Sequence, residues 1–68
     1  MKNIQINTEF IKLDSFLKWT GEVSLGSEAK MFIQEGQVKV NSEVETRRGK
    51  KLIKGDIIEF NGETYKII

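Results

Sequence analysis

One stretch of the sequence decides the fold: Ser27-Glu28-Ala29-Lys30-Met31-Phe32-Ile33-Gln34-Glu35-Gly36-Gln37-Val38-Lys39-Val40-Asn41. Before Gly36, Ala29, Phe32 and Ile33 recur at the three- and four-residue intervals of one helical face. After Gly36, Val38 and Val40 alternate with polar residues, which is the two-residue period of a strand. The stretch therefore predicts a helix that begins near residue 26 or 27, ends at Gly36, and leads into a β-hairpin.

A first helix is predicted upstream, over residues 12–20. Its apolar face consists of residues at the i, i+3, i+4 and i+7 positions: Leu13, Phe16, Leu17 and Thr20. Gly21 follows as a left-handed cap, residues 22–26 form a short connection, and Leu25 is expected to be buried with the second helix. Helices this short do not persist alone in water, so both must pack on another layer.

Strands are predicted on both sides of the helix pair. Residues 2–6 alternate as a short strand, and Asn41-Ser42 turns a hairpin between Val40 and Val44. Residues 54–56 read as a turn, and Asn61-Gly62 as a type I′ turn between strands 57–60 and 63–68. The predicted order is strand, two helices, two strands, a loop and two strands. It corresponds to an α+β fold with a two-helix hairpin packed on a small, mostly antiparallel β-sheet.

The composition is that of a small globular domain. The 68 residues are 38% hydrophobic and 31% charged, and they include neither cysteine nor histidine. A chain of this length forms one core, without disulfides or Cys/His zinc sites to support it. No apolar run is long enough for a signal peptide or a transmembrane helix. We therefore expect a single domain over residues 1–68, monomeric and cytoplasmic.

The sequence offers no arrangement of residues for catalysis. The glycines are isolated and stand where turns are expected, so no phosphate-cradling loop is present. The carboxylates fall mostly on exposed faces, and Asp14, in the first turn of a helix, suits the helix dipole. We expect a protein that is not an enzyme and has no cofactor, metal site or small-molecule substrate.

Positive charge is local although the formal net charge is only +1. Between residues 47 and 54 there are five basic residues and no acidic ones: Arg47, Arg48, Lys50, Lys51 and Lys54. Such a run is either a solvated surface or a contact for a polyanion.

Three segments resemble the S4-type RNA-binding domain, also called the alpha-L RNA-binding motif. Lys12-Leu13-Asp14-Ser15-Phe16-Leu17 is similar to its Arg-Leu-Asp-x-x-Leu opening. Residues 27–41 resemble its Ser-Glu-Ala-Arg-x-x-Ile-x-x-Gly-x-Val-x-Val-Asn-Gly stretch, and residues 54–58 resemble its closing Gly-Asp strand. The resemblance covers residues 11–60 and is greatest to free-standing bacterial members of the YaaA type.

The resemblance implies a module that binds structured RNA, either ribosomal or transfer RNA, including RNA within a ribonucleoprotein particle. Lys12 and Lys30 take the places of two family arginines, and Asn41 takes that of the hairpin asparagine. Gly26 stands where many members have a further arginine, and Ser42 replaces the usual turn glycine. Because lysine lacks the planar fork of arginine, these departures imply a weaker grip on phosphate by the helices.

Physical reasoning adds further candidates on a basic helix-hairpin face. Lys30 and Gln34 lie four residues apart and face the same way, while Ser27 either caps the second helix or contacts an anionic oxygen. Basic side chains gain affinity for RNA by releasing its condensed counterions, which favours recognition of backbone and shape. The candidate RNA-binding residues are Lys12, Ser27, Lys30, Gln34, Lys39, Asn41, Arg47, Arg48, Lys50 and Lys51.

Two alternatives stay open at this point. Residues 4–6 could instead offer an edge strand, which would make the protein an interaction adaptor that pairs with a partner strand. Trp19 either stacks on an unpaired base or covers the core, and a lone Trp beside an apolar helix face favours the second interpretation.

Overall fold

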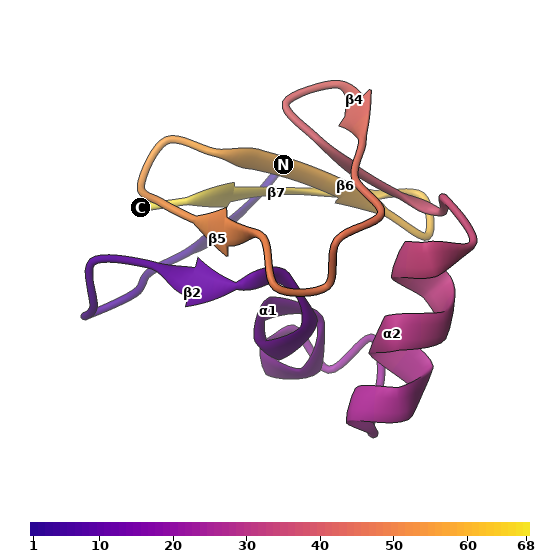
Figure 1. Ribbon diagram of the computed structural model, residues 1–68. Coiled ribbons are helices and arrows are strands. Elements are labelled where there is room, and N and C mark those ends of the chain that lie inside the picture. Colours follow the sequence, from indigo (N-terminus) through magenta and orange to yellow (C-terminus); the bar gives the residue numbers. More distant parts are fainter.

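The computed structural model describes all 68 residues and contains two helices and seven short strands (Figure 1). Their order and bounds are β1 (Lys2–Ile4), β2 (Ile11–Lys12), α1 (Leu13–Trp19), α2 (Gly26–Gln34), β3 (Val38–Val40), β4 (Glu43–Val44), β5 (Lys51–Leu52), β6 (Ile57–Phe60) and β7 (Glu63–Ile67). Neither helix is long or apolar enough to cross a membrane.

The strands form two sheets. Five of them make a sheet in the order β1-β7-β6-β3-β4, antiparallel throughout except that β1 runs parallel to β7. Strands β2 and β5 pair antiparallel as a separate two-stranded ribbon. The predicted helix pair on a mostly antiparallel sheet is confirmed. The ribbon was not predicted, because two-residue strands have too few residues to show a period.

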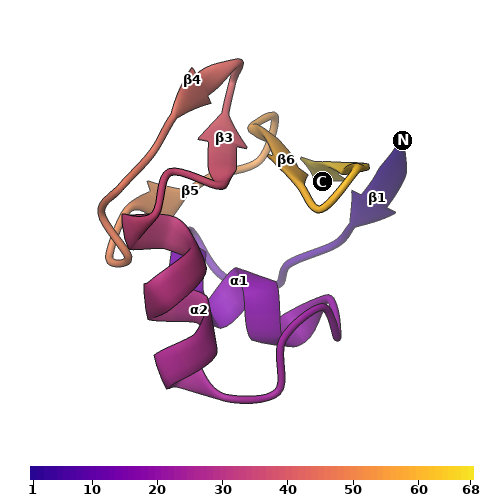
Figure 2. The same ribbon diagram turned by 90° about the vertical axis from the view of Figure 1, so that its right-hand side faces the viewer.

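The core lies between the helices and the inner face of the five-stranded sheet, as Figures 1 and 2 show from two sides. The predicted burial of Leu13, Phe16 and Leu17 on α1, and of Ala29 and Ile33 on α2, is confirmed. The sheet and loops contribute the other buried residues: Ile6, Val23, Val38, Val40, Leu52, Ile58, Phe60, Tyr65 and Ile67. The rings of Phe16 and Tyr65 meet edge to face at 5.5 Å, which joins α1 to the sheet.

Both predicted hairpin turns have the backbone that type I′ requires. Asn61 and Gly62 have φ of 53° and 78°, and Asn41 and Ser42 have φ of 51° and 71°. Ser42 adopts this conformation despite its Cβ, so the turn forms without the glycine that is usual there.

The structure corrects two sequence-based expectations, the burial of Leu25 and the end of the first strand, and it decides the alternatives that the sequence left open for Trp19 and Ser27. Leu25, expected in the core, is 60% exposed, and Val23 fills the space below the helix connection instead. Trp19 is 66% exposed and does not cover the core. Ser27 does not cap α2, because Leu25 is the N-cap and the Glu28 carboxylate accepts the backbone N–H groups of Ser24 and Leu25. The first strand ends at Ile4 rather than Ile6, although the Ile6 N–H still donates a hydrogen bond to the Ile68 carbonyl at 3.0 Å.

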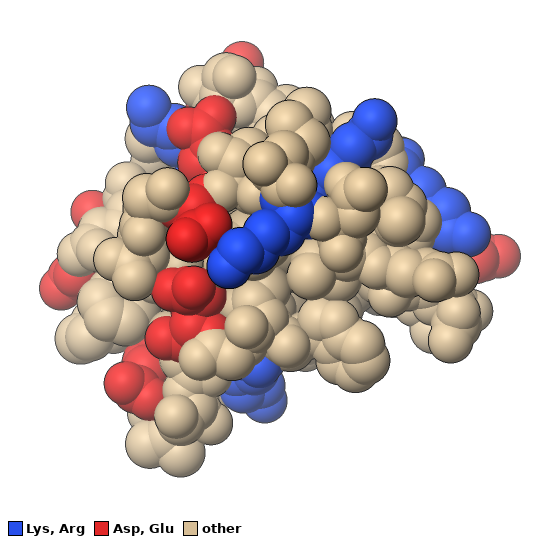
Figure 3. All heavy atoms as spheres, turned by 180° about the vertical axis from the view of Figure 1, so that it is seen from behind, with Lys and Arg blue, Asp and Glu red and all other residues tan.

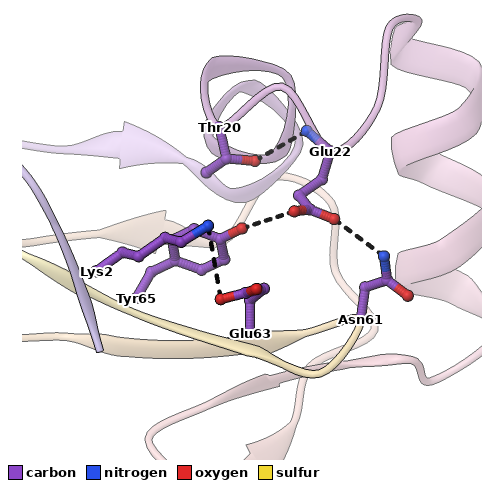
Figure 4. Close-up of polar contacts among 6 residues, drawn as sticks. All are labelled: Lys2, Thr20, Glu22, Asn61, Glu63 and Tyr65. Carbon is purple, nitrogen blue, oxygen red and sulfur yellow. Dashed lines mark hydrogen bonds and ion pairs between the residues drawn. The ribbon is translucent and has the colours of Figure 1, made fainter.

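A hydrogen-bonded carboxylate ties the helix connection to the sheet (Figure 4). Glu22 accepts hydrogen bonds from the Tyr65 hydroxyl and the Asn61 side-chain amide, both at 3.0 Å. The bonds from Asn61 and then Tyr65 lower the pKa of Glu22. Burial, followed by the bond to Glu22, raises the pKa of Tyr65. The loop after α1 is thereby held over the turn between β6 and β7.

We expect Tyr65→Phe to lower Tm by about 5 °C, the shift for the net loss of one hydrogen bond in a domain of this size. Thermal unfolding followed by circular dichroism measures it. Glu63→Gln is the matched control, because it breaks the exposed Lys2–Glu63 ion pair of 3.6 Å, whose loss should cost no more than about 2 °C. Equal shifts in the two variants would show that the Glu22 contact adds nothing.

Candidate nucleic-acid interface

The basic segment before β5 is fastened to the start of α1. The N–H groups of Leu13 and Asp14, which have no partners within the helix, donate to the carbonyls of Lys50 and Arg48 at 2.9 and 3.1 Å. The Lys50 N–H in turn donates to the Arg47 carbonyl at 3.2 Å, which closes a tight turn. Figures 1 and 2 show this segment descending from β4 past the helices to the N-terminus of α1. Its side chains are therefore held at a fixed place beside the helix pair.

The β2–β5 ribbon brings two lysines together. Its register sets Ile11 opposite Leu52, and Lys12 opposite Lys51. Leu52 is buried and Ile11 packs against the core, whereas Lys12 and Lys51 are exposed on the other face. Like charges directly opposite each other on neighbouring strands are destabilising. Neither lysine forms an ion pair, so the ribbon presents two adjacent positive charges that no carboxylate offsets.

Arg47, which the sequence suggested as a contact for RNA, forms an ion pair within the protein. Its Nε and Nη2 donate to the two carboxylate oxygens of Glu45 at 2.9 and 3.1 Å, and its backbone N–H donates to the same group. These bonds lower the pKa of Glu45 from 4.5 to about 2 and raise the pKa of Arg47. Arg48 and Lys50 have no such partner. The basic run therefore contains one compensated charge among uncompensated ones.

Helix α2 contributes an exposed stripe. Ser27, Lys30 and Gln34 are all exposed and lie three and four residues apart, so they share one face of the helix as predicted. A further cation stands near its first residue, since the Lys18 Nζ lies 4.0 Å from where a Cβ at Gly26 would be. Sequence reasoning missed Lys18, which comes from the end of α1 and reaches the place left open by glycine.

Lys39 and Asn41 are set apart from the other predicted residues. Val38 and Val40 face the core, so Lys39 lies on the outer face of the sheet, where its neighbour across β6 is Glu59. Asn41 uses its side-chain amide for two hydrogen bonds within the protein: Nδ2 donates to Asp56 at 3.0 Å, and Oδ1 accepts from the Ile57 N–H at 2.9 Å. Asn41 thus joins the hairpin to the turn before β6.

The side of the molecule that faces away from the viewer in Figure 1 carries a different charge pattern. Figure 3 shows the view from behind, where carboxylates gather in a column along one side and basic groups are interspersed. A shallow hollow on the outer sheet face is lined by Lys39 together with Glu59 and Glu63. Carboxylates gathered in this way make the hollow a less favourable contact for a polyanion.

Uncompensated cations gathered on one part of a small domain are a feature of nucleic-acid-binding proteins. The family model of the S4 domain matches residues 4–68, and the chain belongs to the S4 domain family.

Two curated relatives cover most of the chain. The "Probable ribosome maturation protein RlbA" of Bacillus subtilis strain 168 is 46% identical over 59 residues, which is 87% of this chain and 83% of the relative. The "Putative RNA-binding protein YbcJ" of Escherichia coli K12 is 38% identical over 58 residues, with 85% and 83% coverage.

Two solved structures are also similar. The solution structure of YbcJ, described as having an αL motif involved in RNA binding, superposes with a TM-score of 0.75 at 33% identity over 100% of this chain and 87% of YbcJ. The 30S ribosomal protein S4e of Thermoplasma acidophilum has a TM-score of 0.66 at 23% identity, over 88% of this chain and 32% of S4e. The second likeness concerns the fold alone.

The Glu45–Arg47 pair should make stability depend on acidity. Because folding lowers the pKa of Glu45 from 4.5 to about 2, the pair stabilises the protein above pH 4.5, and this contribution disappears as the pH falls toward 2. We expect the Tm difference between the wild type and Glu45→Gln to be largest above pH 5 and to vanish near pH 2. Glu43→Gln, which removes a neighbouring exposed carboxylate without an ion pair, is the control, and a pH-independent difference for Glu45→Gln would contradict the assignment.

Proposed function

We propose that the protein binds structured RNA, in the first place ribosomal RNA, and carries out no chemistry on it. The proposed contact, called here the basic surface, consists of side chains around the start of α1 and on the exposed stripe of α2: Lys12, Lys18, Ser27, Lys30, Gln34, Arg48, Lys50 and Lys51. One observation carries the proposal. Lys12 and Lys51 lie opposite each other with no carboxylate to offset their charge.

A polyanion relieves the repulsion that this arrangement creates. Each lysine or arginine that neutralises a phosphate releases a condensed counterion, so affinity comes from charge and falls with salt. Hydrogen bonds to α1 fix the protein backbone of the basic segment. Little conformational entropy of this segment is therefore lost when its side chains contact the sugar-phosphate backbone of a folded RNA. Recognition by backbone and shape follows, rather than reading of a base sequence.

The choice of RNA rests on the relatives. RlbA is named as a ribosome maturation protein and YbcJ as an RNA-binding protein, and both match more than four fifths of the chain. We therefore propose ribosomal RNA or a ribosomal precursor particle, rather than transfer RNA, as the partner, and the cytoplasm as the compartment in which it is bound. Binding without catalysis agrees with a chain that has neither histidine nor cysteine to act as base or nucleophile.

The alternative of an edge-strand adaptor has less to support it. Strand β1 is the outer strand of the sheet, but it is three residues long, and its Lys2 is paired with Glu63. Short, charged edges are what proteins use to prevent pairing with other chains.

The double variant Lys12→Ala/Lys51→Ala tests the basic surface. Fluorescence anisotropy with purified ribosomal RNA should show weaker binding and a salt slope that is flatter by about one to two units, as two phosphate contacts are lost. Lys39→Ala/Lys66→Ala, two exposed lysines on the outer face of the five-stranded sheet, changes the net charge equally and should leave the slope nearly unchanged. Equal losses in both variants would mean that only overall charge matters.

The two arginines should behave differently although they are adjacent. Arg48→Ala should flatten the salt slope by about one unit, whereas Arg47→Ala should change it by much less, because Glu45 already compensates Arg47. Glu45→Gln should have the opposite effect and steepen the slope by about one unit, since it frees the guanidinium for a phosphate. The same titration measures all three variants, and equal effects of the two arginine substitutions would contradict this order.

A further inference from the structure

Phe10 is an aromatic residue that the core does not use. It is 37% exposed, and the partly buried residues that pack against the core are Ile4, Ile11 and Phe32. Its backbone directly precedes β2, and its carbonyl accepts a hydrogen bond from the Thr8 hydroxyl at 2.8 Å. A partly bare ring next to a basic ribbon is available for contact with a ligand.

The ring belongs to the same face as the two lysines of the ribbon. The Lys51 Nζ lies 4.8 Å from the centre of the Phe10 ring, which sets ring and ammonium on one side. Side chains alternate along a strand, so Ile53, directly after β5 and 54% exposed, also falls on the side of Lys51. The outer face of the ribbon therefore consists of Phe10, Lys12, Lys51 and Ile53, two positive charges with an apolar residue at the end of each strand.

These side chains match the chemical groups of a single nucleotide. Two ammonium groups suit a phosphate, and an exposed ring suits the flat face of a base. An exposed cation–π contact such as that of Lys51 is weak. When Lys51 moves to a phosphate, the ring becomes available to a base, whose stacking on an aromatic side chain is stronger than the contact it replaces. In a duplex the bases are already stacked on one another, so the base must be unpaired.

Polar groups lie beside the apolar end of this face. An open hollow of about 770 Å³ next to Ile53 is lined by Gln5, Asn7, Thr8 and Lys54, and also by one carboxylate, that of Glu9. Amide and hydroxyl groups there can form hydrogen bonds with the edge of a base that rests on the ribbon.

We infer that the outer face of the β2–β5 ribbon is a subsite for an unpaired nucleotide of the bound RNA. The base stacks on Phe10, and the adjoining phosphates lie between Lys12 and Lys51. This inference rests on the proposed function and adds to it a preference for RNA in which a loop, a bulge or a single strand is present.

The test compares two probes of equal length, labelled oligo(A) and the duplex of oligo(A) with oligo(U). We expect Phe10→Leu to weaken binding to oligo(A) about tenfold, because the ring is lost. Binding to the duplex should change by less than about twofold, and the salt slopes should be unchanged, because no charge is removed. Phe10→Trp, which keeps an aromatic face, should restore the affinity for oligo(A).

Trp19→Leu is the comparison variant, because it removes a second exposed aromatic ring, which lines a neighbouring hollow with Gln5, Asn7 and Thr8. If the base stacks on Phe10, this substitution should leave both affinities unchanged. Thermal unfolding of each variant shows whether the fold is retained. Equal losses for both probes on Phe10→Leu, or no loss at all, would overturn the subsite, and so would a selective loss of oligo(A) binding on Trp19→Leu. If the wild type binds neither probe nor ribosomal RNA, the proposed function itself fails, whereas duplex binding without an effect at Phe10 refutes the subsite alone.

Discussion

The arrangement of charge in this protein depends on two hydrogen bonds, from the N–H groups of Leu13 and Asp14 to the carbonyls of Lys50 and Arg48. Helix α1 is seven residues long, and its N-cap residue supplies no side-chain cap. The carbonyls of a distant basic segment satisfy its first amides instead. The same residues provide the backbone acceptors and the positive side chains. The two hydrogen bonds that stabilise the helix therefore also position the cations. The β2–β5 ribbon lies next to these hydrogen bonds along the chain, and its Leu52 is buried in the core.

Internal pairing then decides which cations are available to a ligand. Arg47 is held by Glu45 in a two-pronged ion pair, and Asn41 spends its amide on Asp56 and Ile57. Lys12, Arg48, Lys50 and Lys51 have no acidic partner. A charge run in a sequence is thus not equivalent to a charged surface in the fold. The relevant quantity is the number of positive groups that remain uncompensated on one face.

Small size explains why the remaining polar contacts carry so much of the architecture. A chain of 68 residues has 14 buried residues in a single core, which leaves little apolar area to hold its loops. Glu22, bound to Tyr65 and Asn61, fixes the connection between the helices, and Asn41 fixes the turn before β6. Exposed residues such as Phe10 and Trp19 stand out against this background, because a small domain has few apolar side chains to spare.

The sequence by itself determined the helix pair, the hairpins and their turns, since a period of 3.6 or 2 and an Asn-Gly or Asn-Ser turn are local properties of the chain. It also indicated that Lys12, Lys30 and the basic run lie at one site, through a resemblance with fixed spacings. Only the tertiary structure decided that Lys12 faces Lys51, that Glu45 compensates Arg47, that Lys39 lies on the other side of the sheet, and that Leu25 and Trp19 are exposed. The opposition of Lys12 and Lys51 depends on strand register, and two-residue strands such as β2 and β5 are too short to have a period from which register could be predicted.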